Sequence, residues 1–177
     1  MKEVVEAKLT LERLRERLDY NPQTGVFVWK TKGSKYSRVK VGAVAGSVAP
    51  NGYVNITIDG SPVPYLAHRL AWFYTYGCWP NKQLDHKNTI RSDNHIENLR
   101  EADYSQNQAN RRANSKCRTG SKGVCYRPKN TRRPWVAFIQ KGADYTYLGA
   151  FAEQDEAAEA YARAASDHYG EFARGRR

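Results

Sequence analysis

Turn-forming residue pairs limit the first half of the chain to short secondary-structure elements. Asn51-Gly52 and Asp59-Gly60 each place a glycine where a tight turn needs one. Between them, Tyr53 to Ile58 alternates polar and apolar residues, the pattern of a strand with one buried face. Val26 to Trp29 is a second strand-like run. We therefore predict a compact β meander across Val41 to Ala67 and short strands rather than long ones.

Two segments with helical periodicity flank these strands. The first follows Thr10, a candidate N-cap, and stops at Asn21-Pro22. The second covers Leu66 to Tyr76, and Gly77 stands where a C-terminal cap belongs. We expect the second helix to pack on the meander. His68 on this helix is a candidate functional residue, with a surface or packing role as the alternative.

The charge of the chain indicates a polyanionic partner. Among 177 residues, 29 lysines and arginines stand against 18 acids, which gives a net charge of +11. The stretch from Tyr104 to Ala143 contains no acid at all. Such a stretch is expected to follow a phosphate backbone, and a solvated basic face or a disordered arm is the alternative. The length allows one medium domain or two small ones.

Other features exclude several classes of protein. Cys78, Cys117 and Cys125 form no Cys-x-x-Cys pair, so neither a zinc knuckle nor a disulfide framework is indicated. No apolar run approaches the length of a membrane span, and the first residues lack the hydrophobic region of a signal peptide. We therefore expect an intracellular protein with reduced thiols and no contact with membranes.

Four polar residues form a constellation suited to phosphodiester hydrolysis: Asp85, His86, Asn98 and Asn107. An imidazole accepts a proton from water, while carboxylate and amide oxygens hold a hard divalent cation. A second amide orients the imidazole. Because the imidazole must be neutral to act as a base, activity is expected to fall as His86 becomes protonated. The alternative is that these residues merely cap turns, where Asn and Asp are common.

The spacing of these residues resembles the HNH endonuclease family. The matching segments are Leu84-Asp85-His86, His95-Ile96-Glu97-Asn98-Leu99-Arg100 and Gln106-Asn107-x-x-Asn110. Upstream, Leu18 to Trp29 and Ala67 to Trp72 look like the leader of phage and mobile-element members, the homing endonucleases.

The resemblance implies a ββα-metal fold with named roles. It makes His86 the general base, oriented by Asn98, and it makes Asp85 and Asn107 the metal ligands. Many relatives have a histidine where Asn107 stands, and ligation by oxygen alone favours Mg²⁺ or Mn²⁺. A phage origin would place the protein in the cytoplasm of a bacterial host.

The last third of the chain indicates three short strands and an alanine-rich helix. Its landmarks are Gly123-Val124, Trp135-Val136-Ala137, Leu148-Gly149-x-Phe151 and Ala157-Ala158-x-Ala160-Tyr161. These segments resemble the ethylene-response-factor (apetala) DNA-binding domain, in which a three-stranded sheet lies in the major groove. Cys125 stands where the plant pattern has a base-reading arginine, so no target sequence carries over.

Nine residues are the candidate DNA contacts of the basic region. Arginines suit guanine edges and phosphates. For any single aromatic residue, filling the core of the sheet is the alternative to contacting DNA. The nine candidates are Arg111, Arg112, Arg127, Lys129, Arg132, Arg133, Trp135, Lys141 and Tyr147.

We therefore predict an α+β protein that combines a nuclease with a DNA-binding module. The expected nuclease domain spans residues 1–112, a basic linker 113–120 and the DNA-binding domain 121–174. Double-stranded DNA is the expected partner. A monomer is expected to nick it, and a dimer is the alternative. Two other functions stay open: a transcription regulator with a non-catalytic nuclease fold, and a nuclease or binder of RNA.

Overall fold

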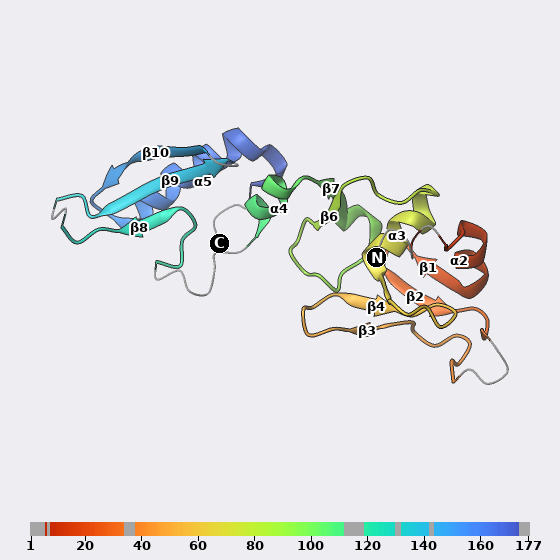
Figure 1. Ribbon diagram of the computed structural model, residues 1–177. Coiled ribbons are helices and arrows are strands. Elements are labelled where there is room, and N and C mark those ends of the chain that lie inside the picture. The colour runs from red at the N-terminus through yellow and green to blue at the C-terminus, as the bar shows by residue number, and fades with distance from the viewer. Residues whose placement is uncertain are drawn as a thin grey trace. The chain divides into compact units, whose positions relative to one another are not determined.

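The computed structural model describes residues 6, 8–33, 38–111, 119–129, 132–141 and 144–173. It is a mixed structure of short helices and small antiparallel sheets, which confirms the α+β class (Figure 1). The described chain divides into two compact units, residues 1–101 and 102–177. The predicted domain limits at 112 and 121 stay a prediction, since Arg112 and most of the predicted linker lie outside the described residues.

The first unit begins with a helix that passes directly into a strand. Helix α2 (Leu11–Arg17) is capped by the Thr10 side chain, which accepts from the Arg13 amide at 3.2 Å. Strand β1 (Leu18–Asn21) starts at the next residue and pairs with β2 (Val26–Trp29). Leu18 therefore belongs to the strand and not to the predicted helix.

The expected meander is present as three very short strands. They are β3 (Ser47–Val48), β4 (Val54–Ile56) and β5 (Tyr65–Leu66), paired in that order. Helix α3 (Ala67–Tyr76) follows at once and ends at Gly77. The φ angle of 75° at Gly77 is left-handed, which glycine adopts without strain, so the predicted C-cap is confirmed.

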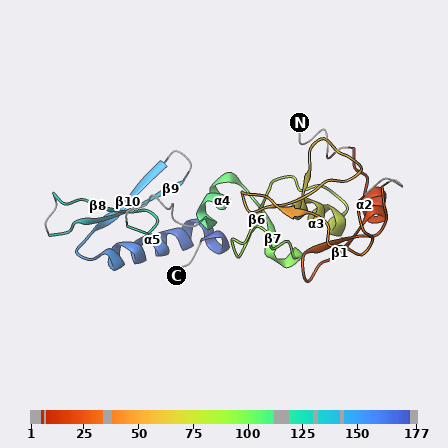
Figure 2. The ribbon, with the colours of Figure 1, turned by 90° about the horizontal axis from the view of Figure 1, so that it is seen from below.

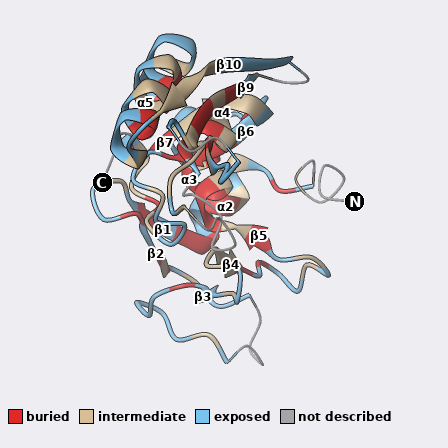
Figure 3. Ribbon diagram, turned by 90° about the vertical axis from the view of Figure 1, so that its left-hand side faces the viewer, coloured by how far each residue is buried: buried red, intermediate tan, exposed pale blue. Residues whose placement is uncertain are grey.

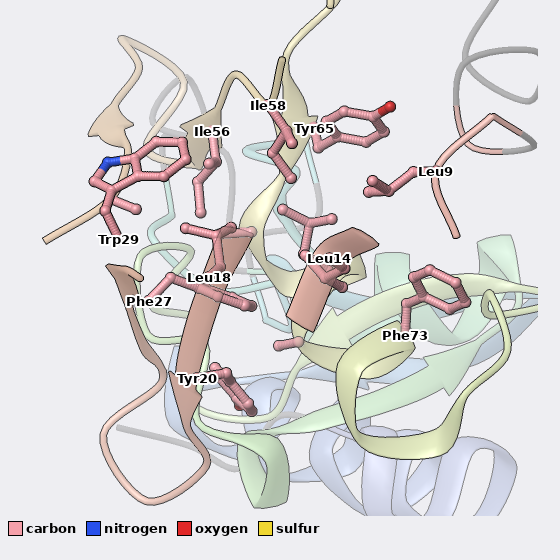
Figure 4. Packing of buried hydrophobic residues seen from close by; sticks show 14 of the residues in the cluster. Leu9, Leu14, Leu18, Tyr20, Phe27, Trp29, Ile56, Ile58, Tyr65 and Phe73 are labelled. Atoms are coloured by element: carbon pink, nitrogen blue, oxygen red, sulfur yellow. The ribbon is translucent and has the colours of Figure 1, made fainter. Parts of the chain in front are cut away.

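One hydrophobic core holds these elements together. Leu14, Leu18, Phe27, Ile56 and Leu70 are its largest fully buried side chains (Figure 4). They come from α2, β1, β2, β4 and α3, so each short element buries one side against the others. In Figure 3 the buried residues of α3 are drawn red, whereas most of the segment around β3 is exposed.

Two paired strands close the first unit. Strand β6 (Gln83–His86) pairs with β7 (Leu99–Ala102), and the short 3-10 helix η1 (Ile96–Asn98) leads into β7. The connection between β6 and η1 is the polar loop 87–95. Strand β6 carries Asp85 and His86, and η1 carries Asn98, so three of the four residues of the predicted constellation lie in this part of the chain.

The second unit starts with helix α4 (Tyr104–Asn110). Asp103 and Gln106 form a reciprocal capping box at the start of α4. The Lys122 ammonium donates to the carbonyls of Gln108 and Ala109 at 2.5 and 2.7 Å, which satisfies the end of α4. Seven residues are too few for a stable isolated helix, so these contacts fix α4 to its own unit.

The rest of the second unit is a three-stranded sheet with one long helix. Strands β8 (Val124–Tyr126), β9 (Trp135–Lys141) and β10 (Asp144–Phe151) pair in the order β10-β9-β8. Helix α5 (Gln154–Tyr169) runs along one face of the sheet, and the 3-10 turn η2 (Gly170–Phe172) follows (Figure 2). Three alanines of α5 are buried, as expected for close packing on a thin sheet.

Candidate nuclease site

Strand β6 carries two buried ionisable residues at its end. Asp85 and His86 are 8% and 4% exposed. The Lys87 amide donates to the Asn98 carbonyl at 2.9 Å, so the end of β6 is joined to the start of β7. Burial of adjacent ionisable groups carries a desolvation cost, and it is tolerated where partners compensate it. Both residues have such partners.

The partner of Asp85 is Arg100 on the neighbouring strand. The Nε and Nη2 atoms of Arg100 lie 3.0 and 2.9 Å from Asp85 Oδ2. Both side chains are largely buried, which makes this a strong charge-assisted contact. The ion pair of Arg100 with Asp85 is not among the residues predicted from the sequence. It depends on the pairing of β6 with β7.

Asn94 is the side-chain partner of the His86 ring. Asn94 Oδ1 lies 3.4 Å from His86 Nε2, and Asn94 Nδ2 donates to the Ser92 carbonyl at 3.1 Å. The bond to Ser92 fixes the amide with its oxygen towards the imidazole. In the tautomer that donates from Nε2 to this oxygen, His86 Nδ1 has the lone pair of a base.

The burial of His86 favours its neutral form. Desolvation lowers the pKa of His86 below its ordinary value of 6.5, and the opposing effects of Asn94, Asp85 and Asp93 are smaller. A neutral imidazole at physiological pH is able to accept a proton from water. This matches the state that the sequence-based role of His86 requires.

Asn98 bonds to the loop that holds Asn94. Its Oδ1 accepts from the Asn88 amide at 3.0 Å, and its Nδ2 donates to the Asp93 carbonyl at 2.8 Å. Asn98 is 3% exposed, so these bonds are sheltered from water. Its expected role in orienting the His86 ring stays a prediction. The contact of Asn94 with His86 was not predicted from the sequence.

The hydrophobic core also anchors this loop. The Tyr20 hydroxyl donates to the Asn94 carbonyl at 2.7 Å, and the Ile96 amide donates to the Pro22 carbonyl at 3.0 Å. Gly25 has a φ of 70°, and a Cβ there would lie 2.2 Å from the His95 nitrogen. Only glycine permits this approach. The turn between β1 and β2 thus holds the loop 87–95 in place through contacts that lie outside the candidate site.

Aromatic rings form one wall beside His86. The His68 ring centroid lies 5.2 Å from that of His86 and 5.1 Å from that of Tyr53. The Arg91 guanidinium lies 5.1 Å from the Tyr53 ring centroid, which places a cation near the site. His68, singled out on the predicted helix, is therefore brought next to His86.

Asn107 lies on α4, which belongs to the second unit. Its amide donates to the Asp103 carbonyl at 3.0 Å, and its role as a metal ligand stays a prediction. Among the described residues there is no group of three or more His, Cys, Asp or Glu side chains able to hold a metal ion. Asp85 still supplies a hard carboxylate. A single carboxylate is a ligand that Mg²⁺ takes in proteins, with water and phosphate in its other positions.

The candidate DNA contacts differ in their surroundings. Tyr147 is exposed, whereas Trp135 is half-buried and packs against the cluster between the sheet and α5. Lys141 is the last residue of β9, and Arg112 lies outside the described residues. Five other cations are exposed in turns or after a helix: Arg111, Arg127, Lys129, Arg132 and Arg133. Trp135 therefore offers less of its ring to a partner than Tyr147 does.

Residues 65–109 match the family model of the HNH endonuclease. The match contains all four residues of the predicted constellation, together with His68, Asn94 and Arg100. It supports an HNH nuclease, a hydrolase acting on DNA. No curated protein and no solved structure matches the chain significantly. No helix in the described ranges is long and apolar enough to cross a bilayer.

Proposed function

We propose that the protein is a metal-dependent DNA endonuclease that hydrolyses phosphodiester bonds with His86 as the general base. The observation that carries this proposal is the buried Asp85-His86 pair at the end of β6, inside the segment that matches the nuclease family. The Asn94 amide gives additional support, because its oxygen faces His86 Nε2 and suits the tautomer in which Nδ1 is the base.

In the proposed reaction, His86 Nδ1 takes a proton from a water that attacks phosphorus, and the bond to the 3′-oxygen breaks. Asp85 would hold Mg²⁺ or Mn²⁺, with Asn107 as the expected second protein ligand. When bound, the cation stabilises the negative charge that develops on the phosphate and the leaving oxygen. Arg100 keeps the Asp85 carboxylate in place. One such centre cuts one strand, so the expected product is a nick.

We also propose that the second unit binds DNA and supplies the affinity that the nuclease centre lacks. Support comes from its exposed cations and from its sheet-plus-helix order, which matches the order expected from the ethylene-response-factor resemblance. Linking two binding surfaces raises affinity without new contacts at either one. Double-stranded DNA is the proposed partner of the whole chain, and the chain is proposed to act as a monomer.

Metal dependence tests this function. Supercoiled plasmid is incubated with the protein in Mg²⁺, in Mn²⁺ or in EDTA, and the experiment is repeated with Asp85→Asn. Open circles that form only with a metal, and that fall by at least about a hundredfold in the variant, are expected. DNA binding without cleavage in any metal would favour the regulator. Cleavage that persists in EDTA would contradict the metal centre.

A further inference from the structure

The sheet of the second unit has one face covered by a helix and one face that carries exposed rings. Paired residues of neighbouring strands share a face, so the register assigns each pair to a side. Val124 and Ala137 pair on the covered side and are buried against α5. Phe138 and Tyr147 pair on the opposite side, which we term the outer face. Figure 2 shows α5 on one side of the sheet only.

Exposed tyrosines dominate the outer face. Tyr145 and Tyr147 are each 66% exposed, and the ring centroids of Tyr145 and Phe138 lie 5.8 Å apart. Tyr126, at the end of β8, is 53% exposed, but its pairing with Trp135 assigns it to the covered side. Phe138, Tyr145 and Tyr147 line a surface hollow of about 880 Å³, which Tyr126 also borders. Contiguous exposed rings of this kind mark a binding surface more often than isolated ones do.

Cations stand at the rim of this hollow rather than among the rings. Arg127 and Lys129 border it, and none of the described residues that line it is acidic. The acidic residue nearest in sequence to these two cations is Asp144, an exposed residue at the start of β10. Cys125 and Val136, another pair on the outer face, are uncharged. The face thus combines rings on β9 and β10 with positive charge in the segment that follows β8.

This arrangement distinguishes between two ways of binding nucleic acid. Reading a duplex through the major groove relies on arginine, lysine or amide side chains directed at base edges. Binding a single strand relies on aromatic rings that stack on unpaired bases and on cations that follow the backbone. In a duplex the ring faces of the bases are already stacked on each other. Among the described residues of β9 and β10, the outer face carries the rings of Phe138, Tyr145 and Tyr147 and a single amide, Gln140.

We propose that the outer face binds single-stranded DNA, with unpaired bases stacked on Tyr145 and Tyr147 and phosphates held by Arg127 and Lys129. This inference rests on the proposed DNA-binding role of the second unit. It adds that this face selects an unpaired strand over a duplex. Duplex segments then contact the exposed cations of the unit without using the rings.

Fluorescence anisotropy with the full-length protein tests the proposal. Labelled oligonucleotides are a mixed-sequence single strand of DNA, the same strand as a duplex, and its RNA counterpart, all in EDTA to prevent cleavage. We expect the single DNA strand to bind more tightly than the duplex at high salt, where phosphate contacts are weakened. Tyr145→Ala/Tyr147→Ala should weaken single-strand binding by at least about tenfold and change duplex binding by less than about twofold.

Two control variants separate stacking from other effects. Tyr104→Ala removes an equally exposed tyrosine from α4 and should leave single-strand binding unchanged. Tyr145→Phe/Tyr147→Phe keeps the rings and should retain the affinity. As a measurement on the unaltered protein, photocrosslinking to 5-iodouracil in the single strand should label Tyr145 or Tyr147 and not Tyr104.

Several outcomes would overturn the proposal. They are equal loss of single-strand and duplex binding in the double alanine variant, crosslinks confined to other residues, or tighter binding of RNA than of DNA. A shift from dimer to monomer in the variant with unchanged DNA affinity would assign the face to a second copy of the chain. Because the assay needs no cleavage, its failure is distinct from failure of the proposed nuclease, which the plasmid experiment measures.

Discussion

At the residue scale, the orientation of the His86 imidazole depends on Asn94, whose side chain is itself held by a backbone carbonyl. Asn94 contacts His86 Nε2 and bonds the Ser92 carbonyl, so its amide cannot rotate freely. We predict that Asn94→Ala lowers the rate of DNA cleavage by roughly 10- to 100-fold, because a small misplacement of a catalytic group has effects of that size. DNA affinity should stay the same. Single-turnover cleavage and anisotropy measure the two quantities separately.

Asn81→Ala is the matched control for this prediction, since Asn81 is exposed and lies in the turn before β6. It should cleave like the unaltered protein. Equal cleavage rates in Asn94→Ala and Asn81→Ala would show that Asn94 does not position His86. Loss of affinity together with rate would instead assign Asn94 to a DNA contact.

The junction of α2 with the β4–β5 turn depends on two arginines that share one carboxylate. Arg13 Nε and Arg17 Nε lie 2.6 and 2.9 Å from the oxygens of Asp59. Partial burial raises the pKa of Asp59, but the hydrogen bonds and charges of the arginines outweigh this effect, and the pKa lies below its ordinary value. Arg17 is almost fully buried. Removal of the Asp59 carboxylate therefore takes away a hydrogen-bond and ion-pair partner of the buried Arg17 guanidinium.

We predict that Asp59→Asn lowers the free energy of unfolding by about 1 kcal/mol at neutral pH. Asparagine tolerates the left-handed φ of 50° at this position, so the backbone is spared. Because folding lowers the pKa of Asp59, the contribution is complete well above the unfolded-state pKa of about 3.9 and disappears as the pH falls through the lower folded-state pKa. Urea unfolding of both proteins across this range measures it. A difference that grows on acidification would contradict the assignment.

The net charge of +11 makes the DNA affinity of the whole chain a function of salt. Each phosphate contact contributes about 0.9 to the slope of log affinity against log salt concentration for duplex DNA. We predict that Lys129→Gln/Arg132→Gln lowers the magnitude of this slope by roughly 2. Arg163→Gln on α5 should leave it unchanged. The slope comes from duplex binding in EDTA at several salt concentrations, and equal slopes for all three proteins would remove Lys129 and Arg132 from the interface.

Local sequence signals predicted most elements of the fold. Thr10 and Gly77 marked helix ends through capping chemistry that acts within a few residues, and both caps are present. Leu18 was assigned to the wrong element, because its apolar spacing fits a helix while its pairing with Trp29 draws it into a strand. Such a pairing depends on residues distant in sequence, and periodicity does not report it.

The candidate site could be predicted only in part. Asp85 and His86 are adjacent, and residue type with spacing identified them. Their partners Arg100 and Asn94 depend on the pairing of β6 with β7 and on how the intervening loop folds back. Tyr147 and Trp135 were predicted to share a role, but they lie on opposite faces of the sheet. A residue list does not show which face a side chain occupies when a bulge interrupts the strand, as between Tyr147 and Gly149.

The most direct test of the proposed nuclease compares His86→Ala with the unaltered protein on supercoiled plasmid in Mg²⁺. His168→Ala, which removes an exposed histidine from α5, is the control. Because no other base is proposed to activate the water, cleavage should fall by at least about a hundredfold in His86→Ala. It should be unchanged in His168→Ala, and the product of the active proteins should be open circles. Full cleavage by His86→Ala would contradict the central claim.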